Sequence, residues 1–145
     1  MHTLRKTALA LLLICVGVHA RALGPPPTAA QLRQWMGDEP CVSAGKHAGI
    51  DYAGALNRAI AKDPAGLIIL FRFTTSHWHD GGVAESHDYI LMGLLQRWGD
   101  QDFARVLRQQ PRRVRKAVID AIHYAFPDPV WRPTQFPLTY SLAPH

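Results

Sequence analysis

The chain has 145 residues and carries 16 Lys and Arg against 11 Asp and Glu, a formal charge of +5. The first 22 residues hold three of these basic residues and no acidic one, so the remaining 123 residues carry only +2. A chain of that length forms one ordinary domain with a hydrophobic core, and so small a charge gives no reason to expect a nucleic-acid partner.

Residues 1–22 have the layout of a secretory signal peptide. Two basic residues precede the apolar run Ala8–Val18, which is far shorter than the ~20 residues that a membrane-spanning helix needs. Ala20 and Ala22 are small residues placed for cleavage before Leu23. We therefore predict an exported protein, periplasmic or secreted, that keeps no transmembrane segment after cleavage.

The first half of the mature chain is predicted to contain three helices and one loop. Thr28 opens a capping box and begins the first helix. The glycine-containing segment Gly37–Gly49 is predicted to be a loop, and a second helix starts at Asp51. An aspartate–proline pair at 63–64 starts the third, in which Leu67–Phe73 is expected to be a buried helix, with a buried strand as the alternative.

The second half begins with the clearest helical periodicity, in which apolar residues recur at 3.6-residue spacing over 83–98. Gly93 inside this segment predicts the close approach of a neighbouring helix. Asp100 is expected to cap a short helix, and Pro111 opens the last one. Five prolines in Pro127–His145 predict an extended strap, rich in proline and aromatic residues, that lies across the helices.

These elements predict an all-α fold of about six helices in stacked antiparallel pairs, either HEAT-like or an irregular bundle. The helical domain would span 23–126 and the strap 127–145. Pro111–Ile122 (PRRVRKAVIDAI) resembles the second helix of a HEAT-type repeat. The resemblance implies a short solenoid, whose usual work is to bind another protein.

The stretch Thr74–Asp88 (TTSHWHDGGVAESHD) concentrates three histidines with carboxylates. With the apolar run before it, this stretch resembles the metal-binding segment of the metallo-β-lactamase superfamily. That resemblance implies His77 and His79 as zinc ligands and Asp80 as the acid. The sequence departs from the family pattern because glycines occupy the positions of its further Asp-His pair, and because the αββα sandwich needs a longer chain.

Two other interpretations of this stretch remain. In the first, His77, His79 and His87 bind zinc with Asp80 or Glu85 beside them, since three such ligands and an open position make a catalytic zinc site. In the second, which we favour, the stretch is a helix connection in which Glu85 complements the positive end of the next helix. His87 would then be a half-buried residue at the edge of the core, and Trp78 would fold back onto the bundle.

A cluster of six cations follows within twelve residues, with no acid among them. An acidic protein surface or an anionic lipid would complement it outside the cytoplasm, whereas a solvated helix face explains it without function. The candidate partner-binding residues are Trp78, Arg105, Arg108, Arg112, Arg113, Arg115 and Lys116.

Cys41 is the one cysteine that remains after removal of the signal peptide, so no intramolecular disulfide can form. We favour a buried thiol, and the alternatives are a homodimer bridged through Cys41 and a thiol nucleophile activated by a histidine.

The sequence therefore predicts an extracytoplasmic, non-enzymatic helical module that binds a protein partner and needs no cofactor. Immunity-type proteins and envelope accessory proteins are of this general kind. The alternative is a small zinc-dependent hydrolase centred on His77, His79 and His87.

Overall fold

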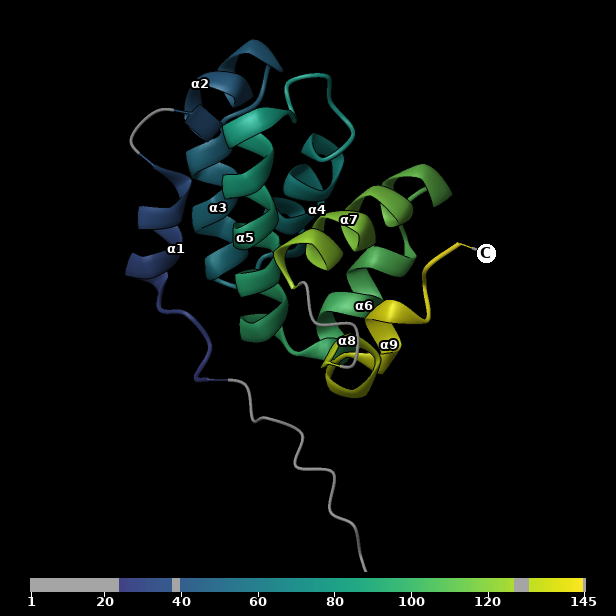
Figure 1. Ribbon diagram of the computed structural model, residues 1–145. Helices are drawn as coiled ribbons and strands as arrows, with labels where there is room; N and C mark the ends of the chain where they lie inside the picture. The colour runs from purple at the N-terminus through teal and green to yellow at the C-terminus, as the bar shows by residue number, and fades with distance from the viewer. Residues whose placement is uncertain (1–23, 38–39, 127–130, 145) are drawn as a thin grey trace, which may run out of the picture.

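The longest described helix, α5 (Gly81–Trp98), lies in the middle of the molecule, and most of the other helices pack against it (Figure 1). A computed structural model describes residues 24–37, 40–126 and 131–144. Every regular element in these ranges is a helix, which confirms the all-α prediction. The predicted signal peptide, 1–22, lies outside the described residues.

Four helices precede α5 and are placed mainly by their caps. They are α1 (Ala29–Met36), α2 (Pro40–His47), α3 (Tyr52–Ile60) and α4 (Pro64–Phe73). The predicted capping box at Thr28 is present, and the carboxylates of Asp51 and Asp63 accept from the backbone N–H groups of Gly54 and Ala65 at 2.9 Å. Leu67–Phe73 is therefore helical, as favoured, and not a strand.

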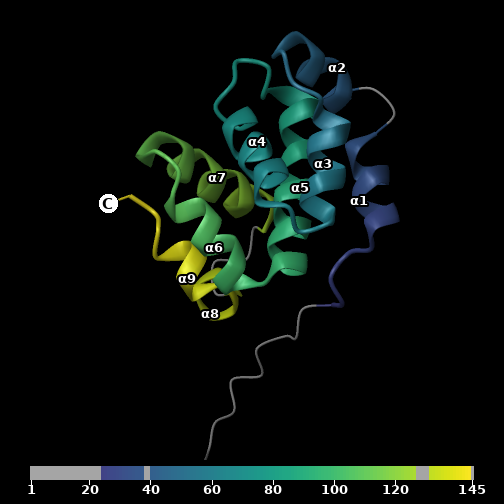
Figure 2. The same ribbon diagram turned by 180° about the vertical axis from the view of Figure 1, so that it is seen from behind.

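Four helices follow α5 on the other side of the molecule from α1, α2 and α3, as both views show (Figures 1 and 2). They are α6 (Asp100–Arg108), α7 (Arg112–Ala125), α8 (Trp131–Gln135) and α9 (Pro137–Tyr140). The helices pack in pairs, with α3 against α4 and α5 against α7, and α5 also contacts α1, α2, α3 and α6. Because several helices surround one, the arrangement is the irregular bundle.

Two glycines allow the closest approaches between helices. A Cβ atom on Gly93 would lie 2.6 Å from the Leu32 side chain, so α1 crosses α5 where the sequence predicted a neighbouring helix. A Cβ atom on Gly66 would lie 2.5 Å from the carbonyl oxygen of Ala55, so α4 packs directly on the backbone of α3. These contacts exclude larger side chains at both positions.

The prediction of a loop over Gly37–Gly49 was wrong for residues 40–47, which form α2. Pro40 occupies the first helical position, where a missing N–H costs no hydrogen bond. Cys41 and Ala44 face the core, and their burial outweighs the weak helix propensity of the glycine and serine beside them.

The prediction of an extended C-terminal strap was also wrong for the described part of that segment, because α8 and α9 are helical. Pro137 stands in the first turn of α9, where proline is tolerated. The carboxylate of Asp100 accepts from the backbone N–H groups of Leu138 and Thr139 at 2.7 and 2.8 Å. Asp100 thus caps α9 and not its own helix, whose N-cap is Gly99.

In the described ranges, none of the helices combines the length and the apolar character that a membrane crossing requires.

Candidate functional site

The histidine-rich stretch forms the connection between α4 and α5 and the first turns of α5. Main-chain hydrogen bonds from Ser76 to Phe73 and from His79 to Ser76 fold the connection into tight turns. Gly81 opens α5 with a φ of 48°, in the left-handed region that favours glycine. Asp80, the N-cap residue, makes no side-chain capping bond.

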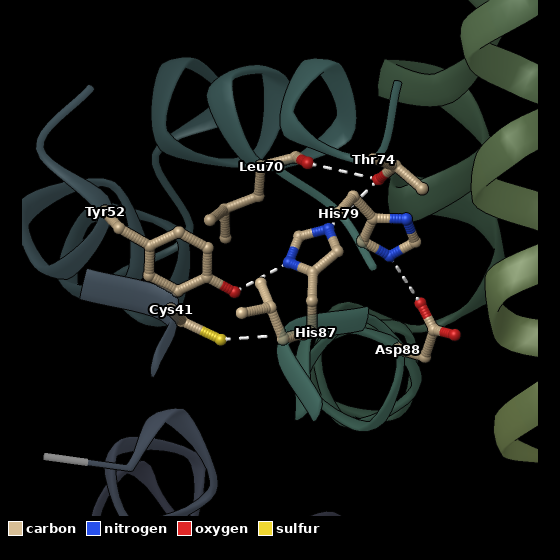
Figure 3. Close-up of polar contacts among 8 residues, drawn as sticks. Cys41, Tyr52, Leu70, Thr74, His79, His87 and Asp88 are labelled. Carbon is tan, nitrogen blue, oxygen red and sulfur yellow. Dashed lines mark hydrogen bonds and ion pairs between the residues drawn. The ribbon is translucent and has the colours of Figure 1, made fainter. Parts of the chain in front are cut away.

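His87 lies at the centre of a buried polar chain that joins α3, α4 and α5 (Figure 3). Its Nδ1 atom is 2.6 Å from the hydroxyl of Tyr52, and its Nε2 atom is 3.0 Å from the hydroxyl of Thr74. The imidazole is fully buried, so the prediction of a half-buried residue at the core edge was wrong. The apolar stripe of α5 carries His87 inward, and two hydroxyl groups satisfy it there.

The partners of Thr74 assign the tautomer of His87. The Thr74 hydroxyl donates its single proton to the carbonyl oxygen of Leu70 at 3.3 Å, so it accepts from Nε2–H of His87. Nδ1 therefore accepts from the Tyr52 hydroxyl. Burial, with the nearby His79 as a smaller cause, holds the pKa of His87 well below its ordinary value. The ring is neutral, and both of its nitrogens are occupied.

Cys41 lies at the other end of this chain, with its sulfur 3.8 Å from the carbonyl oxygen of Val83. Its side chain is fully buried and its thiol is free, which is the alternative that the sequence favoured. Burial raises its pKa to about 11, although the hydrogen bond with Tyr52 acts in the opposite direction. A protonated, buried thiol is a poor nucleophile, so the geometry does not support the thiol-nucleophile alternative.

His79 lies at the outer edge of the buried chain. Its Nε2–H donates to the Asp88 carboxylate at 2.9 Å, and its ring stands edge-on to His87 with 5.2 Å between centroids. Both partners of the bond are mostly buried. Asp88 thereby orients the imidazole of His79.

Trp78 and His77 belong to a separate stack on the outside of the loop. The Trp78 ring lies 4.8 Å from the ring of His47 on α2 and 4.6 Å from the ring of His77. Trp78 is half-buried and packs against the core, as predicted. His77 is exposed.

The structure thus brings His79 and His87 together and leaves the other predicted metal ligands apart. Asp80 and Glu85 are exposed. Among the residues that the structure describes, no three His, Cys, Asp or Glu side chains are grouped so that they could hold one metal ion.

A cleft of about 690 Å³ opens between α5 and α7 beside this loop. His79 and Asp88 line its inner part, and Glu85, Asp120 and Tyr124 line it further out. Three carboxylates therefore face one hollow, next to a tyrosine whose side chain is 66% exposed.

The predicted basic cluster lies at the turn between α6 and α7, and some of its members have local partners. Arg105 pairs with Asp102 at 2.9 Å and Lys116 pairs with Asp120 at 2.6 Å, both on the surface. Arg115 is half-buried and donates to the carbonyl oxygen of Gln110. The exposed members near the turn, which we call the basic turn, are Arg108, Arg112, Arg113 and Lys116.

The basic turn adjoins the histidine-rich loop, because Arg113 donates to the carbonyl oxygen of Thr75 at 3.4 Å. The first turn of α7 contains no acid, and its N-cap, Pro111, offers no side-chain cap. Cations at the positive end of a helix dipole are unfavourable for the helix, although Arg113, Arg115 and Lys116 each have a local partner.

Sequence reasoning missed Tyr52, Thr74 and Asp88 as partners of the histidines. One local signal was available, since the polar pair His87–Asp88 interrupts the apolar stripe of α5. The partners themselves lie up to 35 residues away, and no periodicity connects them.

Comparison of the chain with protein-family models, with curated proteins and with solved structures found no match. The side chains of the site therefore carry the functional assignment.

Proposed function

We propose that this chain is a non-enzymatic, extracytoplasmic protein-binding module that docks an acidic partner at the basic turn. The observation that carries the proposal is the group of three exposed cations of the basic turn in the first five residues of α7, Arg112, Arg113 and Lys116. They oppose the helix dipole there, a cost that an acidic partner would offset.

The histidine-rich loop supports binding over catalysis. The nitrogens of His87 and the Nε2 of His79 already serve the fold, and the candidate nucleophile Cys41 is buried with a raised pKa. Trp78 lies three residues after Thr75, whose carbonyl oxygen accepts from Arg113, so the same connection would bring it near a docked partner. Export, which the first 22 residues predict, would place the partner in the periplasm or outside the cell. Immunity-type proteins and envelope accessory proteins work by such surface complementarity.

The test is cross-linking in the producing cells, followed by capture of the tagged protein and its partners. We expect Arg112→Glu/Arg113→Glu to lose the captured partner. The matched control is Lys46→Glu, which reverses an exposed cation on α2 and should capture the partner as the wild type does.

The same double substitution should leave the fold intact and change the free energy of unfolding by no more than about 1 kcal/mol, because the acids suit a helix N-terminus while the surface hydrogen bond of Arg113 to Thr75 is lost. Loss of capture with retained stability would support the docking surface. Unchanged capture by the double variant, or no partner for the wild type, would contradict the proposal.

A further inference from the structure

Two hollows flank the first half of α5 and share one residue, Glu85. The first is the cleft of about 690 Å³ between α5 and α7. The second, of about 440 Å³, lies between α1 and α5 and is lined by Trp35, Tyr89 and Met92 together with Glu85 and Ser86. Glu85 is exposed on the ridge between them, so one ligand can reach both hollows across it.

Exposed aromatic surface gathers at these hollows. Among the described residues, the large hydrophobic side chains that remain exposed are Tyr89, Tyr124 and Leu138, and the two tyrosines line the two hollows. Tyr89 is 40% exposed and leans towards the half-buried ring of Trp35, with 6.5 Å between centroids. Aromatic residues held open to solvent beside a hollow are typical of protein-binding surfaces.

The charge at the hollows has one sign. Their carboxylate lining residues are Glu85, Asp88 and Asp120. The other ionisable lining residues are His79, Tyr89 and Tyr124, and no lysine or arginine of the described chain lines either hollow. Lys116 neutralises Asp120 from outside the cleft. Asp88 is only 6% exposed, and its Oδ1 accepts from His79. A carboxylate with so little contact with water attracts a cation more strongly than a surface carboxylate does.

We propose that the paired hollows bind a segment of a partner protein in which a lysine or arginine neighbours an aromatic or aliphatic residue. The cation would enter the cleft between Glu85 and Asp88, where Tyr124 offers an aromatic face. The apolar side chain would lie on Trp35, Tyr89 and Met92. This surface is opposite in charge to the basic turn and meets it only where Lys116 pairs with Asp120, so it goes beyond the proposed function.

The experiment selects peptides from a random library displayed on phage, with the purified protein immobilised. We expect enrichment of sequences that place Arg or Lys beside an apolar residue, and weaker binding of the synthesised peptides at high ionic strength. Glu85→Lys should weaken the affinity at least about tenfold, and Tyr124→Ala should weaken it without disturbing the fold.

Two controls make the result specific. Gln101→Lys/Gln109→Lys adds the same positive charge at exposed positions of α6 and its C-cap, and should leave the affinity within about twofold. Arg112→Glu/Arg113→Glu should bind the peptides no more weakly than the wild type, which separates this surface from the basic turn. Selected peptides without cations, no enrichment, or equal affinity for Glu85→Lys would overturn the proposal. Butylguanidine that binds as tightly as the peptides would also overturn it in favour of a small-cation site.

Discussion

The hydroxyl of Tyr52 lies 2.6 Å from Nδ1 of His87 and joins the first residue of α3 to the middle of α5. Both side chains are buried, so neither can replace the bond with water. Burial keeps the histidine neutral, and its Nε2–H donates to the hydroxyl of Thr74 at the end of α4. Three helices therefore depend on one imidazole ring.

Tyr52→Phe should reveal this dependence. The substitution keeps the ring and removes the donor, which leaves Nδ1 of His87 buried without a partner. We expect a loss of about 1–3 kcal/mol in the free energy of unfolding, measured by urea denaturation. Tyr124→Phe, at an exposed position, is the matched control and should change the free energy by less than ~0.5 kcal/mol. Equal effects of the two substitutions would contradict the buried chain.

The free energy of unfolding should be largest near neutral pH and should fall at both acidic and alkaline pH. The pKa of His87 is depressed from its ordinary 6.5, so the unfolded state gains a proton first and stability is lost as pH falls below 6.5. The pKa of Cys41 is raised from 9.0 to about 11, so stability is full below 9.0 and is lost as pH rises towards 11. Burial raises the pKa of Tyr52 as well, which adds to the alkaline loss.

The variant His87→Gln tests the predicted loss of stability at acidic pH. Each proton that only the unfolded state binds contributes a slope of up to ~1.4 kcal/mol per pH unit. The slope of unfolding free energy between pH 5 and the ordinary 6.5 should therefore be smaller in His87→Gln than in the wild type. Identical slopes would mean that His87 titrates normally in the folded protein.

Zinc titration tests the metal-site alternative. Because the described residues contain no group of three potential metal ligands and both nitrogens of His87 are occupied, we expect no one-to-one binding in the submicromolar range by calorimetry. His77→Ala/His79→Ala should give the same heats as the wild type. Tight one-to-one binding that this variant loses would instead favour the zinc hydrolase, through a rearranged loop.

Two glycine substitutions should have opposite signs. Gly66→Ala puts a methyl group 2.5 Å from the Ala55 carbonyl oxygen, and separation of α3 from α4 should cost about 1–3 kcal/mol net of the gain in helix propensity. Gly82→Ala adds a methyl group in open space in the first turn of α5 and should stabilise by about 0.5–1 kcal/mol. Urea midpoints of the two variants provide the comparison, and a stabilised Gly66→Ala would show that the helices are not in contact there.

Asp100→Ala should release the C-terminal helix. The substitution removes the acceptor of two backbone N–H groups of α9, at a cost of about 0.5–2 kcal/mol, and hydrogen exchange at Leu138 and Thr139 should accelerate. Asp102→Ala removes a surface pair with Arg105 and, like Asp100→Ala, an acid from the first turn of α6, so it should cost at most about 1 kcal/mol and leave exchange at Leu138 and Thr139 slow. If exchange stays slow in Asp100→Ala, other contacts hold α9 in place.

Capping and periodicity patterns predicted the structure correctly where it depends on residues close together in sequence. The capping box at Thr28 and the helix start at Asp63 involve residues two or three positions apart, and both are present. The apolar periodicity of α5 was also visible in the sequence, because residues buried on one face of a helix recur every 3.6 residues. Gly93 correctly indicated a helix crossing.

The same sequence patterns gave wrong predictions where a helix depends on contacts with residues distant in sequence. Asp100 was expected to cap α6, but its carboxylate caps α9, 38 residues later, and so permits a helix in a proline-rich segment. The segment 40–47 was expected to be a loop, but burial of Cys41 made it a helix.

The sequence by itself determined the helical class, most helix starts and the presence of a histidine-rich connection, because caps, proline positions and apolar periodicity act over a few residues. The tertiary structure alone decided what each histidine does. His87 meets Tyr52 and Thr74, His79 meets Asp88, and the ring of His77 contacts that of Trp78, since these partners are decided by position in space. Packing of α7 on α5 likewise created the acidic cleft, from carboxylates that stand on different helices.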